Sequence, residues 1–201
     1  MKFSKIKYPN PYGKAQPSKE TVFDLQKKYH FSEQYADFLL TQNGIDFDND
    51  LSNKYLNSIE VDEDYVHPCF DLRYLYGVSS DSEFTDLLGR NEDNYFLPYF
   101  FMIGRGYDGS AYAEVCFGEK KGTIIFLDAE VYMGSENIDV LLDNLDVDED
   151  QRSHLARQEI ADLLLDPDLG LTTIMSDSIS SFLNEMLGYS EYGRGVIHFS
   201  E

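Results

Sequence analysis

Two short runs with a period of two residues, joined by a glycine-bounded turn, constrain the fold more than any other feature. Residues 111–117 alternate between small or apolar side chains and a second set that contains Glu114, which is typical of a half-buried β-strand. Residues 118–122, Gly-Glu-Lys-Lys-Gly, are a hairpin turn signal before the second run at 123–128. The pattern predicts an antiparallel hairpin in a central sheet.

Helical patterns flank this strand-rich region. Ser18 and Ser32 each precede apolar residues at helical spacing and are predicted to cap two helices, the second of which ends at Gly44. Residues 176–187 carry the most regular helical pattern, with Ser176 as its cap. Helices first, strands in the middle and helices last predict an α+β fold. We expect a central, mainly antiparallel sheet with helices packed on one side and helices at both ends of the chain.

Shorter elements are predicted between these regions. Residues 71–76 and 99–103 have strand character, and an edge strand is expected at 196–199. Residues 84–88 offer a short apolar helical face that Gly89 is predicted to close.

The length of 201 residues predicts a single domain that comprises residues 1–201. Residues 1–17, which contain three Pro and one Gly, are predicted to be an extended or disordered lead-in. Helical patterns follow residue 135 and cover about 149–165. Residues 136–168 carry eleven acidic residues against two Arg, so we interpret about 134–170 as an acidic helical insertion.

Charge is the most unusual global property of the chain. Its 37 acidic residues against 16 Lys and Arg give a formal net charge of −21. Residues 1–45 carry a net +3 and residues 46–201 a net −24. Binding to a phosphate backbone requires clustered cations, so direct nucleic-acid contact is not expected. The sign suits a basic protein partner, although acidity that only keeps the protein soluble is an equal alternative.

Cysteine usage and hydropathy bear on location. Cys69 and Cys116, at unpatterned spacing, argue against a disulfide scaffold and favour the cytoplasm. The N-terminus lacks the apolar run of a signal peptide. The longest apolar runs, such as 100–103 and 124–127, are too short to cross a bilayer. The sequence therefore predicts a cytoplasmic protein without membrane contact.

One glycine motif could suggest nucleotide binding. Residues 104–109 spell Gly-Arg-Gly-Tyr-Asp-Gly, a literal G-x-G-x-x-G after an apolar strand. Dinucleotide binding by this motif requires a helix next, whose N-terminus holds the pyrophosphate, but the following residues alternate with period two. The companion motifs of protein kinases are also missing from the sequence. We interpret residues 104–109 as a tight glycine turn between strands.

No metal, cofactor or catalytic motif is predicted. Two acidic triplets resemble the start of a calcium-binding loop, but neither is followed by the Gly and Glu that such a loop needs. The four His are far apart and lack metal-type spacing. An enzyme or small-ligand binder that uses residues 104–109 is a minor alternative. The triplets are Asp46, Asp48 and Asp50, and Asp146, Asp148 and Asp150.

Four segments together carry a resemblance to a known family. They are Tyr-Ala-Asp-Phe-Leu-Leu at 35–40 running into Asn43-Gly44, Leu-Tyr-Gly at 75–77, Leu-Pro at 97–98 followed by Phe-Met-Ile-Gly at 101–104, and Ile-Ser-Ser-Phe-Leu at 179–183. Their order and spacing resemble the SUKH superfamily, which includes bacterial immunity proteins and relatives of a fungal cell-wall regulator. The resemblance covers about residues 18–132 and 171–188. The chain departs from the family pattern at Phe31-Ser32, where Leu-Pro is usual, and in the length of its acidic segment.

The resemblance implies a non-enzymatic protein-binding domain. Many bacterial members look like antitoxins that neutralise toxins, often nucleases, by direct contact. Because nucleases carry basic clefts for phosphate, an acidic inhibitor is physically suited to them. We therefore predict an immunity protein that binds a basic toxin domain. The alternative is an intracellular scaffold or regulatory domain with an endogenous partner, and the sequence predicts no oligomeric state.

Partner-binding residues are expected on the acidic surface and beside it. Single exposed ion pairs contribute only about 0.2–1 kcal/mol, so a few desolvated aromatic anchors are expected to hold the complex. Tyr107 in the glycine turn and Tyr132 beside the insertion are the expected anchors. The full set of expected binding residues is Asp46, Asp48, Asp50, Tyr107, Asp108, Tyr132, Asp146, Asp148, Glu149 and Asp150.

Overall fold

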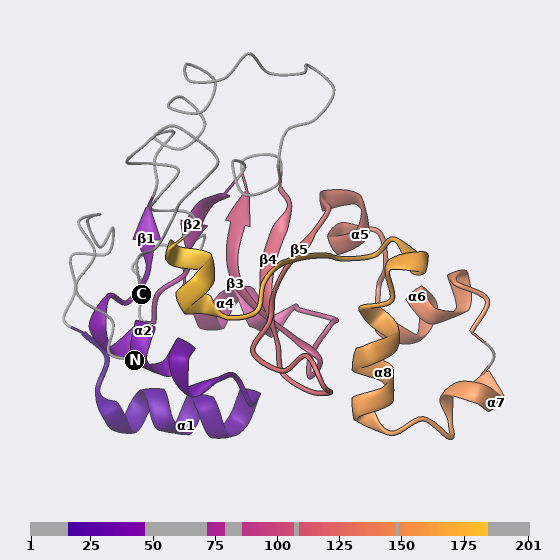
Figure 1. Cartoon of the computed structure of the whole chain (residues 1–201), viewed down its shortest axis with the longest axis horizontal. Coiled ribbons are helices and arrows are strands. Elements are labelled where there is room, and N and C mark those ends of the chain that lie inside the picture. The colour runs from indigo at the N-terminus through magenta and orange to yellow at the C-terminus, as the bar shows by residue number, and fades with distance from the viewer. Residues whose placement is uncertain (1–15, 47–71, 79–85, 107–108, 148, 185–201) are drawn as a thin grey trace, which may run out of the picture.

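One six-stranded antiparallel sheet forms the centre of the fold (Figure 1). The computed structural model describes residues 16–46, 72–78, 86–106, 109–147 and 149–184. The spatial order of the strands is the same as their order in the chain, and every neighbouring pair is antiparallel. The strands are β1 (Ile45–Asp46), β2 (Leu72–Leu75), β3 (Phe100–Gly106), β4 (Ala111–Val115), β5 (Ile124–Leu127) and β6 (Thr173–Ser176).

Helices precede, interrupt and follow this sheet, which confirms the predicted α+β class. A 3₁₀ turn, η2 (Pro167–Leu169), lies shortly before β6, and residues 179–184 are helical after it. The α-helices are α1 (Lys19–Tyr29), α2 (Glu33–Thr41), α4 (Leu87–Glu92), α5 (Ala129–Met133), α6 (Ile138–Asn144), α7 (Glu149–Arg152) and α8 (Arg157–Leu164). The lead-in expected at 1–17 and the edge strand expected at 196–199 lie almost wholly outside the described residues.

The predicted hairpin is confirmed, because β4 pairs antiparallel with β5 and Ala113 lies opposite Ile125. The element after the glycine motif is therefore a strand, and the motif lacks the helix that dinucleotide binding requires. The turn is shorter than predicted, because Gly104 and Gly106 belong to β3. A Cβ at Gly104 would lie 2.5 Å from the Tyr74 carbonyl oxygen. The absence of a side chain at Gly104 thus permits the close approach of β2. Gly104 is not part of a turn.

Both faces of β4 are buried, although its alternation suggested a half-buried strand. Tyr112 contacts Phe182 and Glu114 contacts Ser32, so these two side chains face the helices on one side of the sheet. Ala113 and Val115 point to the opposite face and are also fully buried. The sheet centre is therefore packed on both faces, and polar side chains on it must find partners within the protein.

Several helix boundaries differ from the prediction. Ser18 and Ser32 do cap α1 and α2, but Ser176 belongs to β6, and the Ser178 hydroxyl instead accepts the Ser181 amide. The prediction for Gly89 was wrong, because it lies inside α4, which begins one turn later than its apolar pattern suggested. Capping decides each boundary, since a side-chain acceptor at the right position satisfies the free amides of the first turn.

The helix expected at 149–165 is divided into α7 and α8. Residues 153–156 interrupt it, and the backbone N–H of Ala156 donates to the Glu159 carboxylate at 2.7 Å. That local bond starts a new helix at Arg157, because it satisfies an amide at the N-terminus that no backbone carbonyl can reach.

A buried carboxylate joins α2 to the centre of the sheet. Glu114 accepts the backbone N–H of Ser32 at 2.5 Å and the Ser32 hydroxyl at 3.1 Å. The same hydroxyl accepts the Tyr35 amide at 3.1 Å, so one serine caps α2 and binds β4. Burial raises the pKa of Glu114 to about 7, although the bonds from Ser32 oppose that rise.

We expect Glu114→Gln to flatten the dependence of stability on pH. The unfolded carboxyl ionises near 4.5 and the folded one near 7, so the unfolded state holds fewer protons between these values. The free energy of unfolding of the parent should therefore fall by about 3 kcal/mol as the pH rises through this window. Urea titrations from pH 4 to pH 8 measure the difference between parent and variant.

Glu119→Gln is the matched control for Glu114→Gln, because Glu119 is exposed in the turn that follows β4. It should keep the pH dependence of the parent. An equal slope in Glu114→Gln and the parent would contradict the buried, ionisable state of Glu114.

Phe182 is buried against the sheet, as predicted, and its ring centroid lies 5.9 Å from that of Tyr112. Phe182→Ala should lower the free energy of unfolding by about 3–5 kcal/mol, because it empties a filled aromatic site. Phe23→Ala is the control, since Phe23 is 66% exposed on α1 and should change stability by under about 0.5 kcal/mol. Chemical denaturation of both variants tests the difference, and similar losses would contradict the packing.

Candidate partner-binding surface

The acidic segment 134–170, here called the acidic lobe, lies within the connection between two neighbouring strands. Phe126 on β5 is paired with Thr173 on β6, so the chain leaves the sheet and returns beside its point of departure. The lobe contains α6, α7, α8 and η2. Figure 1 shows these helices gathered at one end of the molecule, with α1 and α2 at the other.

Most acidic side chains of the lobe are exposed, whereas its two Arg are arranged differently. Arg152 is largely buried in ion pairs with carboxylates of the lobe, and Arg157 is exposed on α8. The outer surface of the lobe is therefore strongly negative. The exposed acidic residues are Glu136, Asp139, Asp143, Asp146, Glu149, Asp150, Glu159 and Asp168.

The structure separates the expected binding residues into two described groups. Asp146, Glu149 and Asp150 are exposed at the α6–α7 end of the lobe. Asp46 lies on β1, at the opposite edge of the sheet from β6. Five strand spacings of about 4.8 Å each separate the two edges, so Asp46 and the lobe do not form one continuous surface. Asp48, Asp50, Tyr107, Asp108 and Asp148 lie outside the described residues.

Helix α5, which carries the expected anchor Tyr132, lies close to Gly109. A Cβ built at Gly109 would lie 3.6 Å from the Met133 methyl carbon and 3.8 Å from the Ala129 Cβ. Tyr132 is half-buried there, and burial raises the pKa of its phenol. Met133 is 64% exposed. Met133 is thus the more accessible apolar side chain at this point, and the sequence carried no signal that separates it from its neighbour.

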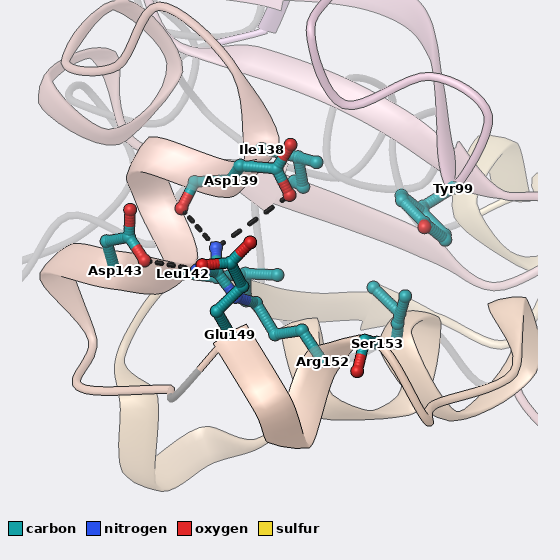
Figure 2. A pocket seen from close by; sticks show the side chains of 9 residues that line it. Tyr99, Ile138, Asp139, Leu142, Asp143, Glu149, Arg152 and Ser153 are labelled. Atoms are coloured by element: carbon teal, nitrogen blue, oxygen red, sulfur yellow. Dashed lines mark hydrogen bonds and ion pairs between the residues drawn. The ribbon is translucent and has the colours of Figure 1, made fainter.

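Arg152 joins α7 to α6 within the lobe (Figure 2). Its guanidinium donates to the Asp139 backbone carbonyl at 2.7 Å and to the Asp143 carboxylate. The Asp139 carboxylate lies 3.8 Å from the same group. Since the Arg152 side chain is only 11% exposed, these bonds lie in a medium that screens less than bulk water. The sequence alone shows Arg152 only as one of two cations in an acidic segment, because its bonding partners depend on the packing of α7 against α6.

A cavity of about 500 Å³ lies between the lobe and the turn that precedes β3. Ile138, Leu142 and Ile160 supply apolar wall, and Tyr99 lines it from the sheet side. The charged groups that line it are Asp139, Asp143, Glu149 and Arg152. Figure 2 shows Tyr99 across the cavity from Asp143. This volume lies within the range of small-ligand sites.

Tyr99 is the least exposed polar side chain that lines this cavity. The residue is 8% exposed, and its phenol has no hydrogen-bond partner within the part of the chain that the structure describes. Burial raises the pKa of the phenol, with a smaller rise from Asp139 and an opposing effect of Arg157. The phenol therefore stays protonated at neutral pH and keeps an oxygen that can accept a hydrogen bond.

The lobe is attached to the sheet through the β4–β5 turn. The backbone N–H of Glu119 donates to the Asp162 carboxylate on α8 at 3.2 Å. A Cβ at Gly118 would lie 2.4 Å from the same carboxylate, and Gly118 has a φ of 84°. The backbone conformation therefore favours glycine, and a Cβ there would also displace the Asp162 carboxylate from the Glu119 amide.

The chain matches no model of a known family, no curated protein and no solved structure in the three comparisons. The resemblance to the SUKH superfamily therefore stays a prediction.

Two further properties concern the described residues alone. None of their helices is both long enough and apolar enough to cross a bilayer. Within the same residues, no group of three or more His, Cys, Asp or Glu side chains is arranged to hold a metal ion.

We expect Arg152→Ala to release α7 from α6 without unfolding the sheet. The variant leaves the Asp139 carbonyl and the Asp143 carboxylate without their donor, and because these residues are exposed and can bind water, the cost to the local structure should be about 0.5–1.5 kcal/mol. Hydrogen exchange of amides in residues 138–152 should speed up accordingly, because local opening becomes easier. Arg157→Ala removes the same charge from an exposed position and should leave these rates unchanged. Equal exchange in both variants would contradict the role of Arg152.

Proposed function

We propose that this chain is a non-enzymatic immunity protein that neutralises a toxin domain of the nuclease type by direct contact through its acidic lobe. The observation that carries the proposal is the accumulation of exposed carboxylates on the lobe, outside the packed sheet. Charges that only served solubility could be spread over the whole surface. Exposed carboxylates also lie elsewhere, but several of them, such as Glu20 and Glu119, have lysines beside them in the sequence. Among the described residues of the lobe, eight exposed carboxylates are offset by a single exposed cation, Arg157.

The charge contrast along the molecule supports an oriented encounter. Helix α1 carries Lys19, Lys27 and Lys28 at the end remote from the lobe. Helix α1 also carries Glu20 and Asp24, so its net charge is only +1. A partner with a basic cleft would therefore be attracted more strongly to the lobe than to α1. A nuclease domain has such a cleft, because it binds phosphate. The resemblance to bacterial immunity proteins points to the same class of partner.

Capture of the partner from the native host tests the proposal. Identification of a basic nuclease domain, together with loss of its nuclease activity when this protein is added in excess, would support it. Capture of an acidic protein, or of a basic one that keeps its activity when bound, would contradict it. A stable complex with an endogenous non-toxic protein would instead favour the alternative of a scaffold or regulatory domain.

We expect the lobe to control the association rate with that partner. A variant with Asp146→Asn, Asp148→Asn, Glu149→Gln and Asp150→Asn should associate about three- to tenfold more slowly at low salt, with a smaller change in the dissociation rate. The difference should shrink as salt rises, because screening limits the field to about 8 Å at physiological ionic strength. Stopped-flow mixing measures both rates.

The matched control removes four acidic charges from α1 and α2 by Glu20→Gln, Asp24→Asn, Glu33→Gln and Asp37→Asn. Both variants have the same net charge, and all four control residues are exposed. The control should associate at nearly the rate of the parent. Equal slowing in both variants would show that total charge, and not the lobe, steers the encounter.

A further inference from the structure

The cavity beside Arg152 has a chemical character that the acidic lobe as a whole does not have. Its lining combines an apolar wall with charged side chains, and the negative charges outnumber the positive one. Three carboxylates, those of Asp139, Asp143 and Glu149, line it against the single guanidinium of Arg152, so its lining carries a net −2.

The guanidinium of Arg152 is already committed. Its terminal nitrogens bond to Asp143 and to the Asp139 carbonyl, and its Nε is buried without a hydrogen-bond partner among the described residues. An anionic ligand would thus meet three carboxylates and one cation whose terminal nitrogens are already bonded. The electrostatics of the cavity favour a cation.

Two polar groups of the cavity remain available to such a cation. The Glu149 carboxylate makes no ion pair or hydrogen bond within the described part of the chain, and it lies at the N-terminal end of α7. The phenol oxygen of Tyr99, a residue that is 8% exposed, is the other. Between them Ile138, Leu142 and Ile160 present hydrocarbon. A carboxylate and a phenol oxygen beside an apolar wall match a group with an aliphatic stem and a positive head.

We propose that this cavity is a docking site for one lysine or arginine side chain of the protein partner. The stem of that side chain contacts the apolar wall, and its head interacts with Glu149 and the Tyr99 oxygen. This inference rests on the proposed function only for the identity of the partner. If the inference holds, the acidic surface of the lobe contains one defined pocket. Anchor side chains at protein interfaces are held in such pockets.

The test uses the full chain and two capped peptides, acetyl-Gly-Lys-Gly-amide and its neutral counterpart acetyl-Gly-Gln-Gly-amide. NMR follows the methyl groups of Ile138, Leu142 and Ile160 during titration. The lysine peptide should shift these methyl signals in a saturable way, and the glutamine peptide should not. Shifts that are absent, or equal for both peptides, would overturn the proposal.

Two variants locate the binding site of the peptide. Glu149→Gln should weaken binding of the lysine peptide about two- to fivefold, the range of one exposed ion pair. Addition of Tyr99→Phe, which keeps the ring and removes the hydroxyl, should weaken binding further. Glu136→Gln is the matched control, an exposed glutamate of the same lobe outside the cavity. Equal weakening by Glu136→Gln and Glu149→Gln would overturn the defined pocket. Tighter binding of spermidine than of the lysine peptide would assign the cavity to a free polyamine and overturn the docking of a side chain.

The two proposals can fail separately. Loss of peptide binding in the parent protein would remove the pocket, while the association rate of the partner would still decide the role of the lobe. Saturable peptide binding, with no effect of the lobe variant on the partner, would keep the pocket and remove the steering surface.

Discussion

The arrangement of this protein depends on the hydrogen bonds to one buried carboxylate in the middle of its sheet. Glu114 lies on the central strand β4, where water cannot reach it, and its two oxygens accept the amide and hydroxyl of Ser32. A buried charge without such partners would be very costly. The N-terminal end of α2 must therefore sit over β4, and its partial positive charge favours the carboxylate there. The aromatic contacts of Phe31 and Tyr35 with Phe101 fill the space around that bond.

The position of the acidic lobe follows from the topology of the sheet. Strands β5 and β6 are antiparallel neighbours, so the segment that connects them leaves and re-enters the sheet at the same end of these strands. A long connection of this kind can project without disturbing the core, because only its two ends are fixed by strand pairing. Its carboxylates stay in water, where they cost little. The internal bonds of Arg152 and the contact of Asp162 with the β4–β5 turn give the lobe a defined shape.

This division between core and lobe explains how one small protein can carry such uneven charge. The sheet faces are covered by aromatic and aliphatic side chains, and Glu114, the fully buried carboxylate among the residues that the structure describes, is held by hydrogen bonds. The functional proposals concern only the lobe and the cavity that it forms with Tyr99. Surface charges affect association more than folding, so the lobe can vary in sequence without a loss of the fold that supports it.

The sequence by itself determined the α+β class, the β4–β5 hairpin, the caps at Ser18 and Ser32 and the acidic character of residues 134–170, because each depends on residues that are near each other in the chain. Strand β6 was missed, since Thr173–Ser176 is short and becomes a strand only by pairing with β5. Tertiary structure alone decided that Glu114 is buried and that Gly104 serves close strand approach. It also decided that Tyr99 and Glu149 share a cavity. These depend on contacts between segments far apart in sequence, which no local pattern encodes.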